Sequence, residues 1–180
     1  MECPQRKAGL EMNREAIFWL QIAVGVGVFS LMGAWYVWPQ LKKRSPSSAL
    51  APLLWVQVFR YVGMTLLVAG MVDPKLSHSL LRDGAYGDLI AAALALVSIL
   101  ALRYKWSGAI ALVWVANLWG FLDVLNVLRG VITSDVPSYN LESIWYIYTF
   151  YAPLVVVSAL MIFMVLLKSR SWNEAKVRAD

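Results

Sequence analysis

The sequence predicts an all-α protein: a polytopic transmembrane helical bundle of five spans, with one added helix beside a four-helix bundle. Of its 180 residues, 60% are hydrophobic and only 15% are charged, whereas about a quarter of the residues in a soluble domain are charged. The apolar residues gather in five runs, each long enough to cross most or all of a bilayer core of about 30 Å as a helix. Lys and Arg cluster at the ends of these runs, which is the distribution that sets membrane orientation. The net charge of +5 therefore indicates a lipid bilayer as the partner and no nucleic acid.

The first span is predicted at residues 16–38, after a polar N-terminal segment, 1–15. The run is longer than the core of a signal peptide and lacks a small-residue cleavage site, so we expect it to be retained. Pro39 is expected to end this helix, because proline supplies no backbone N–H. Whether translation starts at Met1 or at Met12 stays open.

The second span is predicted at residues 50–72, after a loop of sequence LKKRSPSS. The three consecutive cations of that loop place it in the cytoplasm. Beyond the span, the sequence DPKLSHSLLRDG predicts a short helix on the opposite surface. Asp73 is its expected N-cap, and Gly84 is expected to close it.

The third and fourth spans are predicted at residues 84–102 and 107–128. Arg103 and Lys105 lie between them, which is consistent with a cytoplasmic loop. Arg129 is expected to lie just past the end of the fourth span.

The fifth span is predicted at residues 144–167, and residues 169–180 form a basic cytoplasmic tail. Pro153 should kink this helix by freeing the carbonyl of Thr149. The first loop, the third loop and the tail together hold nine Lys and Arg residues, against six on the other side. The charge distribution predicts an N-terminus outside and a C-terminus in the cytoplasm, in a membrane that we expect to be the bacterial inner membrane.

A buried polar cluster is predicted around Arg60, which lies near the middle of the second span. Its guanidinium stays charged at physiological pH and costs roughly 3 kcal/mol at the centre of a membrane helix without a partner. We predict that Asp123 of the fourth span meets it, with Gln57 and Asn117 as hydrogen-bond neighbours. A purely structural role for this pairing and a role as a functional site are both open at this point.

Asp88 lies at the outer end of the third span, where an N-cap is the simplest interpretation and a site role is the alternative. His78 is the only histidine and Cys3 the only cysteine. His78 is expected in a solvated loop. We predict no metal site and no cofactor, because no second strong metal ligand lies at a suitable spacing.

The fourth and fifth spans are also rich in aromatic residues. If several of these rings line a pocket with Asp123 and Glu142, that pocket suits a flat lipophilic small molecule or a cationic intermediate stabilised by ring faces. The rings are those of Trp114, Trp119, Trp145, Tyr146, Tyr148 and Tyr151. The alternative is that these rings anchor the helices at the interface and pack against lipid.

Three motifs contain these polar residues: Gln57-x2-Arg60-x2-Gly63, Gly87-Asp88 and Trp114-x2-Asn117-x2-Gly120-x2-Asp123. They carry a resemblance to small bacterial membrane proteins of the DoxX-like four-helix type. It covers the second to fifth spans and implies a compact helical bundle, with no established reaction to transfer. The chain departs from the pattern around the second loop, where Asp73-Pro74 replaces a Leu-Pro pair.

Three functions remain after the sequence is read for nucleotide loops, metal-ligand clusters and nucleophile–base pairs, none of which it contains. A non-catalytic subunit or accessory factor, in a larger membrane complex or a homo-oligomer, needs the fewest assumptions. The alternative is a membrane-embedded enzyme acting on a lipophilic substrate of the quinone or isoprenoid type, with Asp123 or Glu142 as a general acid. A transporter is less favoured, because the sequence shows no inverted repeat and no pair of broken helices.

Overall fold

The computed structural model of the protein describes the backbone of residues 13–177 and the side chains of residues 13–168. Residues 1–12 lie outside the described residues. They include Cys3 and both candidate start residues, Met1 and Met12. The basic side chains of the tail also lie outside the described residues.

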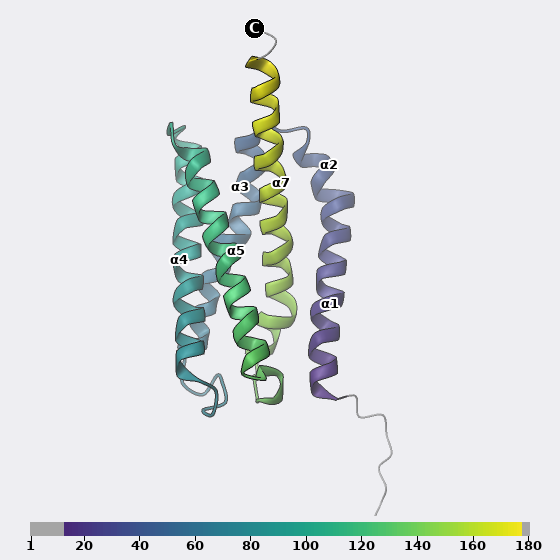
Figure 1. Cartoon of the computed structure of the whole chain (residues 1–180), viewed down its shortest axis with the longest axis vertical. Coiled ribbons are helices and arrows are strands. Elements are labelled where there is room, and N and C mark those ends of the chain that lie inside the picture. Colours follow the sequence, from purple (N-terminus) through teal and green to yellow (C-terminus); the bar gives the residue numbers. More distant parts are fainter. Residues whose placement is uncertain (1–12, 178–180) are drawn as a thin grey trace, which may run out of the picture.

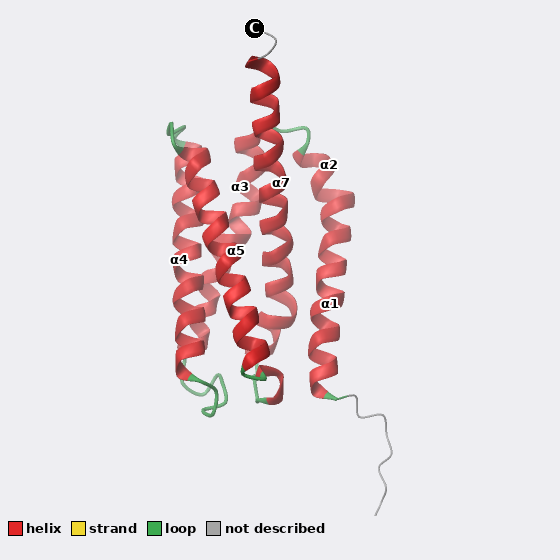
Figure 2. Ribbon diagram, in the orientation of Figure 1, coloured by secondary structure: helices red, strands yellow, loops and turns green. Residues whose placement is uncertain are grey.

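The described residues form helices and loops and contain no strand (Figures 1 and 2). Five helical stretches among them are long and apolar enough to cross a membrane, which confirms the all-α class and the expected number of long apolar helices. The elements are α1 Arg14–Met32, the π-helical turn η1 Gly33–Val37, α2 Trp38–Leu41, α3 Pro46–Val58, the 3-10 helix η2 Phe59–Leu67, α4 His78–Arg103, α5 Ala109–Thr133, the 3-10 turn η3 Val136–Ser138, α6 Ile144–Tyr146, the π-helical turn η4 Ile147–Tyr151 and α7 Ala152–Val177.

Four of the long helices pack together, and the first stands at the side of this bundle. The helix formed by α3 and η2 contacts α4 and α7, and α5 contacts both α4 and α7. By contrast, α1 packs on α7 and η4, at the side of the molecule opposite α4 (Figure 1). In this arrangement α1 is the added helix.

The second long helix covers residues 46–67, not the predicted 50–72. It starts earlier because Ser45 is extended and Pro46 takes the first helical position, which proline favours. It ends earlier because its second half is a 3-10 helix. A 3-10 helix rises about 2.0 Å per residue against about 1.5 Å for an α-helix, so nine such residues add roughly 4.5 Å of length.

The predicted short surface helix between the second and third spans is wrong. Residues 78–103 form one continuous helix, α4, with Ser77 at its N-cap. Gly84 lies inside this helix, because a single glycine costs only about 1 kcal/mol there and α4 packs along its length on α3, η2 and α5. Asp73 instead caps a turn, since its Oδ1 accepts a hydrogen bond from the backbone N–H of Lys75 at 3.0 Å.

The predicted helix end at Pro39 is wrong, because helical residues continue past this proline. The predicted kink at Pro153 stays a prediction. Each proline is preceded by a wider π-helical turn, η1 before Pro39 and η4 before Pro153. This widening accommodates a residue that donates no hydrogen bond and crowds the preceding turn. The first helix therefore continues past Pro39 to Leu41. The fourth span likewise continues past Arg129, to Thr133.

The core has two apolar clusters with a polar layer between them. One cluster is at the end of the bundle that holds the first and third loops, and it includes Leu54, Val113 and Ile162. The other is at the opposite end and includes Phe18 and Leu141. Three buried polar side chains, Gln57, Arg60 and Asn117, lie between residues of the two clusters on their own helices. The other buried polar side chains of the long helices are Ser98, which lies between Ala95 and Ile99 of the first cluster, Thr149 and Ser158.

Candidate functional site

Arg60 is the centre of the polar layer, and its side chain is only 2% exposed. Its Nε donates to Asp88 Oδ1 at 2.8 Å, and its Nη2 lies 2.7 Å from the same oxygen. Nη2 also donates to Asp123 Oδ2 at 2.5 Å, and Nη1 donates to the carbonyl oxygen of Gly120 at 2.8 Å. Every nitrogen of the guanidinium is thus bonded to α4 or α5. We call Arg60, Asp88 and Asp123 the Arg60 cluster.

The 3-10 geometry of η2 places Arg60 in the interior. With about three residues per turn, every third side chain returns to the same face. The buried residues of η2 follow that period: Arg60, Gly63 and Leu66. The spacing of the motif Gln57-x2-Arg60-x2-Gly63 is therefore the spacing of one face of this helix.

Three glycines make room for the charged groups of the Arg60 cluster. A Cβ at Gly63 would collide with the carboxylate of Asp88, and one at Gly87 would collide with that of Asp123. A Cβ at Gly120 would lie 2.9 Å from Nη1 of Arg60. Each charged group thus sits against a neighbouring helix at a position where any larger residue would displace it.

The Arg60 cluster does not balance its charge, because one guanidinium faces two carboxylates. The side chain of Asp88 is 20% exposed and that of Asp123 is 9% exposed. Within the described part of the chain, Asp88 Oδ2 and Asp123 Oδ1 receive no hydrogen bond. With both carboxylates ionised, the cluster carries a formal charge of −1 and has one unused oxygen on each aspartate.

Asp88 is not an N-cap, and that interpretation is wrong. It lies inside α4, well past the first residue of the helix, His78. The N-cap interpretation followed from a span predicted to start at residue 84, whereas α4 starts at His78 and Gly87 seats the carboxylate of Asp123. His78 is exposed, as expected, but begins a helix rather than lying in a loop.

Gln57 and Asn117 are buried near the cluster but bind a different helix, so their predicted role as hydrogen-bond neighbours of the Arg60–Asp123 pair is wrong. Gln57 Nε2 donates to Ser158 Oγ at 2.6 Å and to the carbonyl of Val155 at 3.1 Å. Asn117 Nδ2 donates to the carbonyl of Ala159 at 3.1 Å. Both amides therefore attach their helices to the backbone of α7. Among the described side chains, Asn117 Oδ1 is the buried polar atom without a hydrogen-bond partner.

Two of the aromatic residues that were considered as a pocket with Asp123, Trp114 and Tyr148, have separate packing partners. Trp114 packs on Phe163, with ring centroids 5.7 Å apart. Tyr148 packs on Phe18 at 6.1 Å. These contacts place the rings in helix–helix packing rather than around Asp123.

Tyr151 bonds to the helix that carries Arg60, whereas Glu142 stands apart from the expected pocket. The hydroxyl of Tyr151 donates to the carbonyl of Val56 at 2.7 Å. Glu142 is exposed in the loop before α6, where its backbone takes the left-handed conformation at φ 43°. It lies outside the polar layer, which leaves Asp123 as the candidate acid that is near the Arg60 cluster.

A groove of about 440 Å³ runs between α4 and α5, and Asp123 lines it. We call it the α4/α5 groove. Its residues follow the same spacing of i, i+3, i+4 and i+7 in both helices, which places each set on one helix face. The lining residues are Asp83, Tyr86, Gly87 and Ile90 of α4 with Trp119, Leu122, Asp123 and Asn126 of α5.

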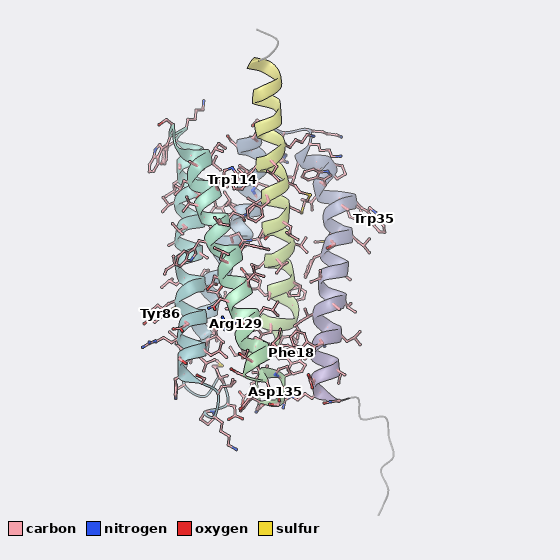
Figure 3. All side chains as sticks on the ribbon, viewed as in Figure 1. Phe18, Trp35, Tyr86, Trp114, Arg129 and Asp135 are labelled. Carbon is pink, nitrogen blue, oxygen red and sulfur yellow. The ribbon has the colours of Figure 1, made fainter. Side chains whose placement is uncertain are left out.

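The sequence reasoning missed Asp83 and Tyr86 as site residues, and it considered Trp119 only as one of several rings that could line a pocket with Asp123. Their signal was the matching spacing in two neighbouring helices, with an aspartate in each set. Figure 3 shows Tyr86 on the outer flank of α4, away from α1.

A second groove of about 440 Å³ adjoins the first toward the end of the bundle that holds the second and fourth loops. It shares Asp83 and Asn126 with the α4/α5 groove and extends past Arg129 to Ser134. Polar side chains thus follow the α4–α5 contact from that end of the molecule to the Arg60 cluster.

Comparison with known proteins found no match among curated proteins and none among solved structures. Residues 17–167 match the family described as a domain of unknown function (DUF8737). This match does not test the resemblance to DoxX-like proteins, and that resemblance stays a prediction from the motifs. The matched stretch covers most of the chain and contains the whole Arg60 cluster, and the chain belongs to the DUF8737 family.

Proposed function

We propose that the protein is an integral membrane protein that serves as a non-catalytic subunit or accessory factor, in which the Arg60 cluster locks three helices together. One observation carries this proposal: the guanidinium is almost fully buried, and all of its nitrogens are bonded within the protein. A guanidinium with each nitrogen bonded to the protein in this way holds helices in register.

Insertion in a membrane is supported by the outer surface of the bundle. Exposed large apolar side chains occur on each of the long helices, and Trp35 stands on the outer flank of the first one (Figure 3). A soluble monomer rarely exposes so much contiguous apolar surface, whereas lipid is a suitable solvent for it.

The proposed location is a bacterial inner membrane, with the N-terminus outside and the C-terminus in the cytoplasm. The first and third loops lie at the same end of the bundle as the C-terminal end of α7 (Figure 1). The cations of these loops, which include Lys42, Arg44 and Lys105, therefore gather at one end. Such a gathering favours the cytoplasmic side. The proposed relation to DoxX-like proteins rests on the motif around Arg60 and adds no reaction.

The subunit role is tested by native mass spectrometry of the full chain, purified from its own membranes in a mild detergent. We expect a stoichiometric partner protein or a defined homo-oligomer. As a control, the variant Arg82→Met, which changes an exposed position of α4, should give the same species as the unchanged chain. Recovery of a monomer alone, in several mild detergents and after cross-linking in the membrane, would overturn the subunit proposal.

A second candidate function is an enzyme that acts on a quinone-like or isoprenoid-like substrate, with Asp123 as a general acid. The observation that favours it is the position of Asp123 on the wall of the α4/α5 groove. Solvent extraction of the purified protein followed by mass spectrometry should then show such a lipid enriched over the surrounding membrane. The same enrichment in the Asp123→Asn variant, with turnover of that lipid unchanged, would count against the acid role.

A further inference from the structure

The α4/α5 groove has an excess of negative charge. Asp83 and Asp123 both line it, and neither Lys nor Arg is among its lining residues. Arg60 offsets only one of the two carboxylates to which it is bonded. An unbalanced charge inside an apolar bundle is costly unless a counter-charge reaches it. Asp123 Oδ1 is the oxygen that a counter-charge in the groove can reach, because it lies against Gly87, which lines the groove.

The remaining walls of the groove are aromatic and apolar. Tyr86 and Trp119 are about half exposed, and Ile90 and Leu122 are exposed beside them. Ring faces attract organic cations by about 0.5–2 kcal/mol each. The apolar residues face the surroundings of the bundle, which we propose to be lipid, so a ligand with a hydrocarbon chain has a route of entry from the side.

We propose that the α4/α5 groove is a binding site for an amphiphilic organic ammonium ion. Its cationic head lies near Asp123 Oδ1 and Asp83, between the rings of Tyr86 and Trp119. Its hydrocarbon chain follows Ile90 and Leu122. Asp123 Oδ2 keeps its bond to Arg60, so binding leaves the contacts of the Arg60 cluster in place.

An organic cation fits these walls better than a metal ion does. Hard metal cations bind six or more oxygen ligands or keep several waters. In the part of the chain that the structure describes, no group of three His, Cys, Asp or Glu residues is placed to hold a metal. Two carboxylates with two rings match an ammonium head, and a volume of about 440 Å³ is in the ordinary range for a small-molecule site.

The experiment uses the full chain in a neutral maltoside detergent and follows thermal unfolding as dodecyltrimethylammonium is added. We expect a saturable rise in the unfolding temperature. Tetramethylammonium and sodium at the same ionic strength should give little or no rise, and dodecylphosphocholine should give a smaller one, because its phosphate opposes the carboxylates.

Matched variants separate this site from a general detergent effect. Trp119→Leu should weaken the apparent affinity about three- to tenfold, which is the loss of one cation–ring contact. Trp55→Leu is the control, since Trp55 is 46% exposed and Trp119 is 45% exposed, but Trp55 lies outside the groove. Asp83→Asn should also weaken binding severalfold. These variants avoid the Arg60 cluster, so the fold should persist.

The proposal fails if the wild-type chain shows no saturable rise, or if Trp55→Leu loses as much affinity as Trp119→Leu. An equal rise with sodium alone would also overturn it, because an inorganic ion would then be the ligand. The site does not depend on the subunit role. Partner co-purification and cation binding are separate measurements, so either proposal can fail while the other stands.

Discussion

Arg60 shows how a single charged residue can be buried at a tolerable cost. Two carboxylates and one carbonyl replace the water that the guanidinium loses. The low dielectric of the interior strengthens these bonds, but it also makes any unpaired member of the cluster expensive. The single residues of this cluster are therefore the positions where the largest effects on stability are expected.

Replacement of Arg60 by Met should lower the free energy of unfolding by about 3–5 kcal/mol, because it leaves two buried carboxylates without their partner. Adding Asp123→Asn to this variant should recover part of the loss. Unfolding in mixed micelles, arranged as a double-mutant cycle, gives the coupling energy. Arg82→Met serves as the exposed control and should change stability by no more than about 0.5 kcal/mol. A coupling energy near zero would mean that the two side chains do not form a pair.

Replacement of Gly120 by Ala should destabilise the protein by about 1–3 kcal/mol, because the added methyl group would push against Nη1 of Arg60. Gly27→Ala is the matched control, since a Cβ at Gly27 meets nothing within 4 Å. That control should be neutral or slightly stabilising, because alanine favours the helix. Equal effects of the two substitutions, measured by thermal unfolding, would contradict the seating of the guanidinium against this glycine.

At the scale of elements, the attachment of α7 depends on amide side chains from two other helices. Gln57 donates two hydrogen bonds to α7, and Asn117 donates one while its own oxygen has no described partner. Interhelical hydrogen bonds in membranes contribute about 0.6 kcal/mol on average. The two amides should therefore differ in what they contribute to stability.

Gln57→Leu should cost about 1 kcal/mol, and Asn117→Leu should cost less, because it also removes a buried oxygen without a partner. The measurement is the free energy of unfolding of both variants in the same micelles. If Asn117→Leu proved the more destabilising of the two, its amide oxygen would have a partner that the structure does not contain.

At the scale of the whole molecule, the distribution of cations predicts the orientation. In a background in which Cys3 is replaced by Ser, a membrane-impermeant maleimide should label Ser79→Cys in intact cells. It should label Ser47→Cys only after the cells are opened. Both serines are exposed, one at each end of the bundle. The reverse labelling pattern would show that the predicted orientation is wrong.

The parts of this structure that the sequence predicted are those set by long apolar runs and by charge. Five runs predicted five helices, and the cost of a buried guanidinium led from Arg60 to Asp123. The continuous α4 was missed because Gly84 is a local signal for a helix end, and packing overrode it. The bonds from Gln57 and Asn117 to α7 were missed for another reason: two of their three acceptors are backbone carbonyls, which any residue supplies, and the third is the hydroxyl of Ser158.

The 3-10 helix η2 has a consequence for how the gene can change. With about three residues per turn, the insertion of one residue between Gln57 and Arg60 would turn the guanidinium by about a third of a revolution. Gln57 would stay attached to α7, while the positive charge would face hydrocarbon and both aspartates would lose it. A codon gained or lost here should therefore harm the protein more than most amino-acid replacements in the same stretch.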